Sequence, residues 1–384
     1  MPEVGAEVRH DGPMRSPKHV LVTGGAGFIG SHVVDQLVEN GVQVSVLDNL
    51  DPAAHEGEPH YLNPGASYVW GDVRNADAWR QILPGVDAVC HQAGKVGLGV
   101  DFGDAASYVD HNDVGLVTGL GVLHERGFDG GFVLASSMVV YGEGRYRCAH
   151  DGLVRPGPRR ANDLAAGHFE PPCPICGLSL TAEAIPEDAP LEPRNVYAAT
   201  KLHQEHLLEA FAREHAISAT SLRYHNVYGP RMPRDTPYAG VASIFRSALA
   251  SGKAPRVTED GNQMRNFVHV RDVAAANVLA LKRTEPITVA MNVASPQPRS
   301  VGDMATALAS AFGSAANDVL WPIVTGEFRL GDVRHVFASA TKASTELGFT
   351  AAVPFDEGMA EFAHASMRAP TSGRLRAQES TVLL

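Results

Sequence analysis

The stretch Thr23-Gly24-Gly25-Ala26-Gly27-Phe28-Ile29-Gly30-Ser31 decides the fold, because its glycines recur every third residue between an apolar run and a helical pattern. In such a turn the first glycine permits a tight bend, the next lets backbone amides approach a pyrophosphate, and the last lets helix and strand pack closely. The helix that follows points its positive end at the anion. The stretch therefore predicts a dinucleotide site made by Gly24, Gly27, Phe28, Ile29 and Gly30.

An acidic residue ends the next apolar run and separates this reading from an ordinary surface glycine turn. Asp48 can accept hydrogen bonds from the ribose hydroxyls of adenosine, and its charge would repel a 2′-phosphate. No basic residue follows at Asn49 or Leu50, so the sequence predicts that NAD and not NADP binds here. Asn49 is predicted to contact the cofactor together with Asp48. Asp72 and Val73 follow the third run and are predicted to flank the adenine, although Asp72 suits an ordinary strand-end turn equally well.

Short apolar runs alternate with helical patterns along the first half of the chain, which predicts a parallel sheet covered on both faces. The predicted strands are 19–23, 42–48, 68–70, 88–91, 132–136 and 218–223, and the predicted helices are 29–40, 76–83, 114–126 and 196–215. From 228 onward, proline and glycine recur and the alternation weakens. We expect a smaller lobe there, from which 266–293 returns to the main sheet.

The composition excludes several classes of partner. A formal net charge of −11 disfavours nucleic acid and anionic membranes, and no apolar run reaches the roughly 18 residues that span a bilayer. Residues 1–17 are polar and of mixed charge, which predicts a disordered tail and not a signal peptide, and 370–384 is interpreted as a second disordered tail. Four cysteines in 384 residues do not form a disulfide framework. We therefore expect a cytoplasmic protein.

Tyr197 and Lys201 are four residues apart in a predicted helix, so both side chains project from one face. An ammonium group near a phenol stabilises the phenolate and lowers the pKa of the tyrosine from about 10. The tyrosine can then act as a general base toward a hydroxyl. A Tyr and a Lys four residues apart are common on exposed helices. Because the glycine-rich turn and the serine pair at 136–137 precede them here, we interpret Tyr197 and Lys201 as a catalytic pair.

Together these motifs resemble the extended short-chain dehydrogenase/reductase family, the NAD-dependent epimerases and dehydratases of nucleotide sugars. The resemblance extends over most of 18–355 and includes Ala135-Ser136-Ser137 with Tyr141-Gly142, and Arg223-Tyr224-His225-Asn226-Val227-Tyr228-Gly229-Pro230. It implies an α/β fold with a Rossmann-type doubly wound parallel sheet at 18–227. It also implies a smaller C-terminal substrate-binding lobe at 228–369, and a homodimer.

The resemblance also assigns roles to single residues. Ser137 would hydrogen-bond the reacting sugar oxygen, and Lys95 and Asn112 would join Tyr197 and Lys201 at the cofactor. The pyrophosphate of the nucleotide sugar would be held by Asn226, Arg265 and Arg334. Guanidinium groups match phosphate oxygens in shape and charge, although each of these arginines taken alone would suit a solvated surface.

The residues after Ser137 bear on the reaction. The family's dehydratases carry Thr-Asp-Glu there, whereas this chain has Ser137-Met138-Val139, and neither Met nor Val can transfer a proton. The resemblance therefore implies a 4-epimerase acting on a UDP- or dTDP-hexose through a 4-keto intermediate. A nucleotide-sugar 4-ketoreductase is the nearest alternative. A non-catalytic nucleotide-binding scaffold is a further alternative, against which Ser137, Tyr197 and Lys201 argue together.

Residues 143–193 interrupt the strand–helix alternation and form a Pro- and Cys-rich insertion. Cys173-Pro174-Ile175-Cys176-Gly177 resembles a zinc knuckle, and Cys148, His150, Cys173 and Cys176 would make a closed four-ligand zinc site. His168 competes with His150 for the nitrogen position, and a flexible loop with free thiols is the plain alternative. The insertion resembles one in enzymes similar to dTDP-L-rhamnose 4-epimerase, which favours dTDP-6-deoxyhexoses.

Overall fold

The computed structural model describes residues 14–52, 54–97, 102–234 and 240–368. Of the two predicted tails, 1–13 and 370–384 lie outside the described residues. A seven-stranded sheet forms the centre of the molecule, with strand order β14-β9-β5-β4-β1-β2-β3 and every neighbouring pair parallel. Its strands, in chain order, are β1 His19–Thr23, β2 Gln43–Asp48, β3 Ala66–Trp70, β4 Ala88–His91, β5 Gly131–Ser137, β9 Ala219–Tyr224 and β14 Thr288–Val293.

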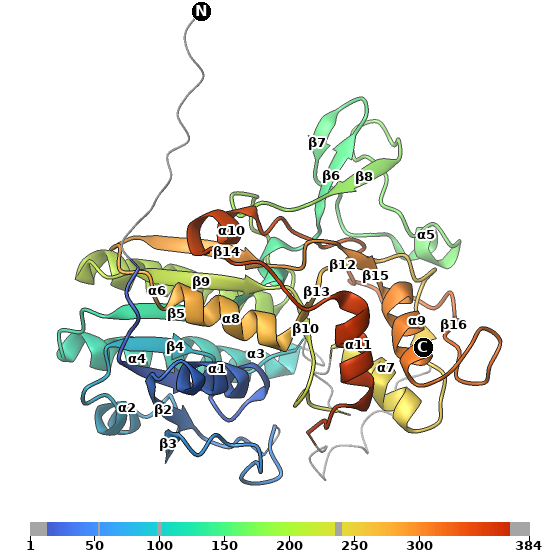
Figure 1. The fold of residues 1–384 in the computed structure, drawn as a ribbon. Coiled ribbons are helices and arrows are strands. Elements are labelled where there is room, and N and C mark those ends of the chain that lie inside the picture. The colour runs from blue at the N-terminus through green and yellow to red at the C-terminus, as the bar shows by residue number, and fades with distance from the viewer. Residues whose placement is uncertain (1–13, 53, 98–101, 235–239, 369–384) are drawn as a thin grey trace, which may run out of the picture.

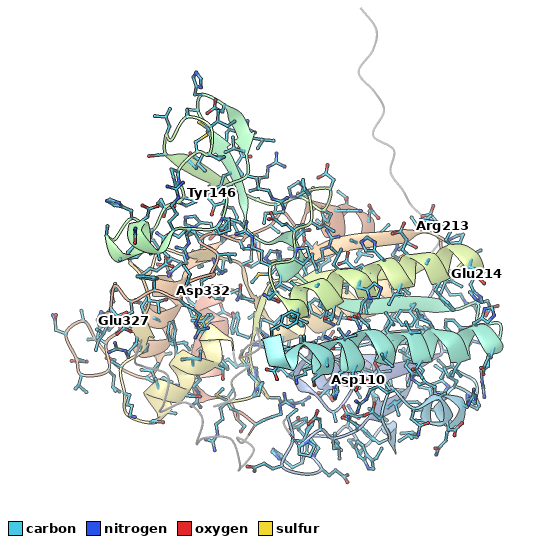
Figure 2. All side chains as sticks on the ribbon, turned by 180° about the vertical axis from the view of Figure 1, so that it is seen from behind. Asp110, Tyr146, Arg213, Glu214, Glu327 and Asp332 are labelled. Atoms are coloured by element: carbon cyan, nitrogen blue, oxygen red, sulfur yellow. The ribbon has the colours of Figure 1, made fainter. Side chains whose placement is uncertain are left out.

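Helices cover both faces of this sheet, as the sequence predicted, and the predicted fold class is confirmed (Figures 1 and 2). On one face lie α1 Phe28–Glu39, α8 Val270–Ala280 and α10 Thr341–Leu347, and on the other α2 Ala76–Ile82, α3 Ala105–Tyr108, α4 Gly115–Glu125 and α6 Val196–His215. A π-helical segment, Val109–Val114, joins α3 to α4. Because both faces are covered, the central strands are apolar almost throughout, and all five residues of β1 are buried.

The strand order reverses between β1 and β4, since the chain runs outward to β2 and β3 on one side and through β5 and β9 on the other. In an open parallel sheet, ligands bind in the crevice outside the carboxyl ends of the strands at this reversal. Gly24 follows β1 there and Ala93 follows β4. The topology thus places the glycine-rich turn, the end of β4 and the end of β5 at one edge.

A smaller C-terminal lobe packs beside this edge (Figure 1). Its helices α7 Val241–Ala250, α9 Val301–Ala311 and α11 Phe355–His364 bury one apolar cluster. Short strand pairs complete it: β10 Asn226–Tyr228 with β13 Phe267–His269, β11 Arg256–Val257 with β16 Ile323–Val324, and β12 Met264–Arg265 with β15 Arg299–Ser300. Within the described residues, no helix is both long and apolar enough to cross a bilayer.

The insertion at 143–193 is an ordered projection, which Figure 1 shows standing away from the main sheet. It forms a three-stranded antiparallel sheet of order β7-β6-β8, together with a short helix. These elements are β6 Arg145–Cys148, β7 Gly152–Val154, α5 Ala161–Ala165 and β8 Leu180–Glu183. At its base, Ile185 packs in one apolar cluster with Val140 and Tyr141, which precede the insertion, and with Ala294 and Val336.

Candidate active site

The glycine-rich turn between β1 and α1 has the shape of a phosphate cradle. Gly24 has a φ of +68°, and a Cβ there would lie 2.6 Å from the backbone nitrogen of Ala93. A Cβ on Gly30 would lie 2.1 Å from the carbonyl oxygen of Gly24. No side chain caps α1 at Gly27, so the positive end of the helix faces the cradle. Only glycine fits these close approaches, and the turn can receive a pyrophosphate.

Asp48 lies beside this cradle at the end of β2 and is held by two backbone amides. Its Oδ2 accepts a hydrogen bond from the Ala26 amide at 3.0 Å, and its Oδ1 accepts one from the Leu50 amide at 2.9 Å. The fixed carboxylate is 7% exposed. This position suits the predicted role of Asp48 toward ribose hydroxyls.

Asp72 is held at the end of β3 by Asn49 and Arg74. Asn49 Nδ2 donates to Asp72 Oδ2 at 3.1 Å, and Arg74 Nε donates to Oδ1 at 2.9 Å. The Arg74 guanidinium holds the pKa of the Asp72 carboxyl well below its usual range. The carbonyl of Val73 accepts a hydrogen bond from Trp79 Nε1 at 2.7 Å. Asn49, Asp72 and Val73 therefore form one rigid corner of the predicted adenine site.

Ser137 and Tyr197 meet where β5 ends and α6 begins. Asn195 caps α6, accepting a hydrogen bond from the Ala198 amide at 2.8 Å, and this cap fixes the first turn that carries Tyr197. Burial raises the pKa of Tyr197 to about 12, while a hydrogen bond with Ser137 lowers it. The tyrosine alone is thus a poor base near neutral pH, and an added positive charge beside the phenol would make it a better one.

Lys201 lies one turn further along α6, in a buried network. Its Nζ donates to the carbonyl of Ala135 and to Gln204 Oε1, both at 2.9 Å. Gln204 Nε2 donates in turn to the carbonyl of Asn112 at 2.7 Å. Burial lowers the pKa of Lys201 to about 8, opposed by the charges of Asp113 and Glu205. The lysine is thus held by a carbonyl and an amide oxygen. With a pKa of about 8, it is mostly protonated near neutral pH.

Asn112 joins this network to the end of β4. Its Oδ1 accepts from the Lys95 amide at 2.7 Å, and its Nδ2 donates to the Lys95 carbonyl at 3.1 Å and to Thr200 Oγ1 at 3.0 Å. Lys95 Nζ donates to Ser107 Oγ at 2.8 Å. The structure therefore brings Lys95, Asn112 and Lys201 together. Sequence reasoning missed Gln204, whose only signal was a polar residue three positions after Lys201 on a buried helix face.

The pKa of Lys201 leads to a stability prediction. Its folded-state pKa of about 8 lies below the unfolded value of about 10.4. Between these values the unfolded chain holds more protons, so stability rises with pH there, and the penalty of the buried charge is fully present below about pH 8. We expect the unfolding free energy of the wild type to gain on the order of 2 kcal/mol relative to Lys201→Met between pH 7.5 and 10. Urea unfolding of both proteins across that range measures this difference, and parallel pH profiles would contradict it.

Two predicted substrate residues have the character of ligand-binding groups. Asn226 Oδ1 is buried and has no hydrogen-bond partner among the described residues. The guanidinium of Arg265 donates to the carbonyls of Met264, Val333 and Arg334, each at 2.8 Å. Within the described ranges Arg265 makes no ion pair with a carboxylate, and burial lowers its pKa. A half-buried guanidinium that donates to backbone carbonyls and is paired with no carboxylate among the described residues is suited to an anionic ligand.

The comparisons with known proteins decide the family. The sequence matches the model of the NAD dependent epimerase/dehydratase family over residues 20–161 and 177–294. The chain belongs to this family. A dTDP-L-rhamnose 4-epimerase of Burkholderia thailandensis is 33% identical over 349 residues, which cover 90% of this chain and 93% of that relative. A putative UDP-glucose 4-epimerase of Methanocaldococcus jannaschii is 29% identical, with 88% and 95% covered.

Solved structures agree with this placement in the NAD dependent epimerase/dehydratase family. The UDP-glucose 4-epimerase of Thermus thermophilus, solved in complex with NAD, superposes with a TM-score of 0.71 at 28% identity. The UDP-glucose 4-epimerase of Thermotoga maritima, solved with UDP-glucose, gives 0.72 at 28% identity. Each match covers 90% of this chain and 97% of the other. The resemblance inferred from the motifs is confirmed, and the glycine cradle with Asp48 fits the NAD of the family.

The prediction for Arg334 needs correction. Its guanidinium is 1% exposed and donates to Glu170 at 2.7 Å, to Glu259 at 2.9 Å and to Asp260 at 2.7 and 2.8 Å. These carboxylates occupy the donors that a pyrophosphate would need. Arg334 therefore links Glu170 of the insertion to Glu259 and Asp260 of the C-terminal lobe. Of the two predicted arginines, only Arg265 remains suited to the substrate.

The prediction for the insertion needs correction at one position. Cys148, Cys173 and Cys176 do come together, but the fourth residue of the cluster is Asp151. The side chain of His150 is 75% exposed and contacts only the outer oxygen of that carboxylate, with Nδ1 2.9 Å from Asp151 Oδ1. His168, the competing histidine, is also exposed and is not part of the cluster.

Proposed function

We propose that this member of the NAD dependent epimerase/dehydratase family is a nucleotide-sugar 4-epimerase. The observation that carries the proposal is the hydrogen bond of Ser137 with Tyr197 at the start of α6, with the buried Lys201 one turn further along, in a chain with no acid at 138 or 139. The residues at 138 and 139 begin a 3₁₀ turn, Met138–Tyr141, that leads away from Ser137. No group there can donate a proton to a leaving hydroxyl, so loss of water is disfavoured.

Each residue of the site has its own task in this reaction. Tyr197 takes the proton of the sugar C4 hydroxyl, Ser137 orients the same oxygen, and Lys201 keeps the phenolate stable. Bound NAD supplies a reversible hydride acceptor in this chemistry. Asn226 and Arg265 hold the pyrophosphate, so the 4-keto sugar can turn about that linkage and be reduced on its opposite face. Tyr197 then returns the proton, and no cofactor is consumed.

We propose a dTDP-6-deoxyhexose such as dTDP-L-rhamnose as substrate, ahead of UDP-hexoses. The support is the Burkholderia thailandensis relative, whose name states dTDP-L-rhamnose 4-epimerase, at 33% identity over 90% of this chain. The nearest alternative, a 4-ketoreductase, most often uses a dissociable NADPH. Asp48 disfavours this, because its carboxylate lies where a 2′-phosphate would need a cation.

Three further properties belong to this proposal. We propose a homodimer working in the cytoplasm, in line with the acidic composition. We propose that residues 228–369 bind the sugar nucleotide while 18–227 bind NAD. We also propose that the insertion carries a structural zinc ion on its three clustered cysteines.

An NMR assay of purified enzyme with UDP- and dTDP-hexoses tests the function. With no cofactor added beyond a catalytic amount of NAD, we expect a 4-epimer to accumulate to a fixed ratio without build-up of NADH. The sugar that reacts fastest identifies the substrate. Absence of any epimer, together with consumption of a 4-keto sugar when NADPH is supplied, would establish the reductase instead.

A further inference from the structure

The four groups at the tip of the insertion already have the spacing of a tetrahedral metal site. Their ligand atoms all lie within 4.8 Å of one another. Cys148 Sγ lies 3.5 Å from Cys176 Sγ, and Asp151 Oδ2 lies 3.1 Å from Cys173 Sγ and 3.4 Å from Cys148 Sγ. Tetrahedral zinc with ordinary bond lengths needs about 3.8 Å between sulfurs and about 3.5 Å between sulfur and oxygen. An ion of that size fits with small shifts of the side chains.

The backbone around these residues has the form of a ligand loop. The Cys173 carbonyl accepts the Gly177 amide at 2.9 Å, and Gly177 has a φ of +76°, which turns the chain back toward β8. Cys148 ends β6, and Asp151 lies in the turn between β6 and β7. Two separate turns therefore point two ligands each at one centre.

The tip of the insertion lacks an apolar core of its own. In residues 147–154 and 172–183, the only buried side chains are Cys148 and Cys173. A small sheet without an apolar core is not stable alone, and a metal is one of the few ways to fix it. The family match also stops at 161 and resumes at 177, so the segment with Cys173 and Cys176 is a feature of this chain that the family model does not describe.

The loop between Cys148 and Cys173 carries two contacts to the C-terminal lobe. Glu170 binds Arg334 and lies 3.0 Å from His335 Nε2, while Arg159 pairs with Glu259 at 2.7 Å, with both side chains almost completely buried. Arg159 also donates to the Asp332 carbonyl at 2.8 Å. We call Arg159 and Glu170, with their partners, the latch. In Figure 2, Tyr146 of the insertion is labelled above Asp332 of the lobe. The Tyr146 hydroxyl accepts a hydrogen bond from the His335 amide at 3.2 Å.

We infer that the insertion binds zinc through Cys148, Asp151, Cys173 and Cys176, and that this site closes the loop that carries the latch. The inference rests on the zinc proposed above for the insertion and not on the epimerase reaction. His150 positions the site: by contacting the outer oxygen of Asp151, it turns the inner oxygen toward the sulfurs. The segment 333–334, which the latch fixes, supplies two of the carbonyls that hold Arg265. The metal thus steadies a pyrophosphate-binding arginine from a distance.

Metal content and affinity test the ligand set. Protein purified without added metal is expected to contain about one zinc per chain, and cobalt in its place should show the thiolate charge-transfer band of a tetrahedral site. Competition with a chromophoric chelator should show the lowest zinc affinity for Cys173→Ser and the next lowest for Asp151→Ala. His150→Ala should lower the zinc affinity by only about 10- to 100-fold. The reverse order for the last two would overturn Asp151 as ligand. A metal-free protein, or one with a disulfide joining Cys148 and Cys176, would overturn the site.

Substrate binding tests the latch separately. We expect removal of zinc to weaken UDP or dTDP binding, measured by calorimetry, by roughly tenfold, with retained NAD unchanged. Glu170→Gln should reproduce that loss with zinc still bound. Glu183→Gln should not, because among the described residues this insertion carboxylate pairs only with Arg145 and Arg147. Unchanged nucleotide affinity after zinc loss would leave the metal site standing and overturn its role in the latch. Neither measurement depends on epimerase turnover.

Discussion

Replacing Tyr197 with phenylalanine is expected to lower the turnover number by roughly 10²- to 10⁴-fold while NAD stays bound. The substitution removes only the oxygen that takes the C4 proton. Tyr197 has no role in the glycine cradle or in the Asp48 contacts, so the cofactor keeps those interactions. Its ring packs near Tyr108, with centroids 6.1 Å apart, and phenylalanine preserves that packing.

Steady-state kinetics with a saturating sugar nucleotide measure this effect, and the absorbance of cofactor released on denaturation measures bound NAD. Tyr68→Phe is the matched control, because it removes a tyrosine hydroxyl on β3 whose hydrogen bonds, within the described part of the chain, go only to the backbone of Asn63. The control should keep wild-type turnover. A Tyr197→Phe enzyme with ordinary turnover would refute the proposed base, and one that has lost NAD would show that the phenol acts mainly in binding.

The central sheet could be predicted because its strands leave a strong local signal. Most are short apolar runs with a glycine, aspartate or asparagine next to at least one end, and the predicted 19–23 and 88–91 agree with β1 and β4 without change. The predicted 132–136 and 218–223 differ from β5 and β9 by one residue at each end. Burial on both faces requires such runs, so the pattern follows directly from the architecture.

The lobe and the insertion were predicted only in outline. Their strands are two to four residues long, which is too short for an alternating pattern to show. The insertion reads as a loop without period, yet it contains β6, β7 and β8. The segment before 114 was also missed, because α3 and the π-helical turn place Asn112 inward without a regular helical repeat.

The two corrected site residues show what a motif omits. Arg334 was assigned to the pyrophosphate by its type, but its partners Glu170, Glu259 and Asp260 lie 74 to 164 positions away in sequence. Only the folded chain shows that they surround it. His150 and Asp151 are neighbours in one turn, and a sequence cannot say which of two adjacent side chains faces the cysteines.

Removing the carboxylate of Glu205 is expected to be the most destabilising single change near the site. Glu205 and Arg223 form an ion pair at 2.7 Å with side chains 9% and 5% exposed, directly beneath the end of β5. Ser136 Oγ also donates to Glu205. Glu205→Leu leaves the Arg223 cation buried without its carboxylate, which costs about 3–5 kcal/mol of unfolding free energy. The end of β5 that carries Ser137 should loosen at the same time.

A double variant separates the value of this pair from the cost of stranding one charge. In Glu205→Leu with Arg223→Met, no charge of the pair remains buried, so we expect less destabilisation than in Glu205→Leu alone. Arg223 also donates to the Tyr141 hydroxyl and the Glu187 carbonyl, both at 3.0 Å. Because the double variant loses these two hydrogen bonds as well, we expect its unfolding free energy to stay below that of the wild type. Urea unfolding of the wild type, the two single variants and the double variant completes the cycle. Additive losses would mean that the two side chains act independently, and the ion pair would then not be what fixes the end of β5.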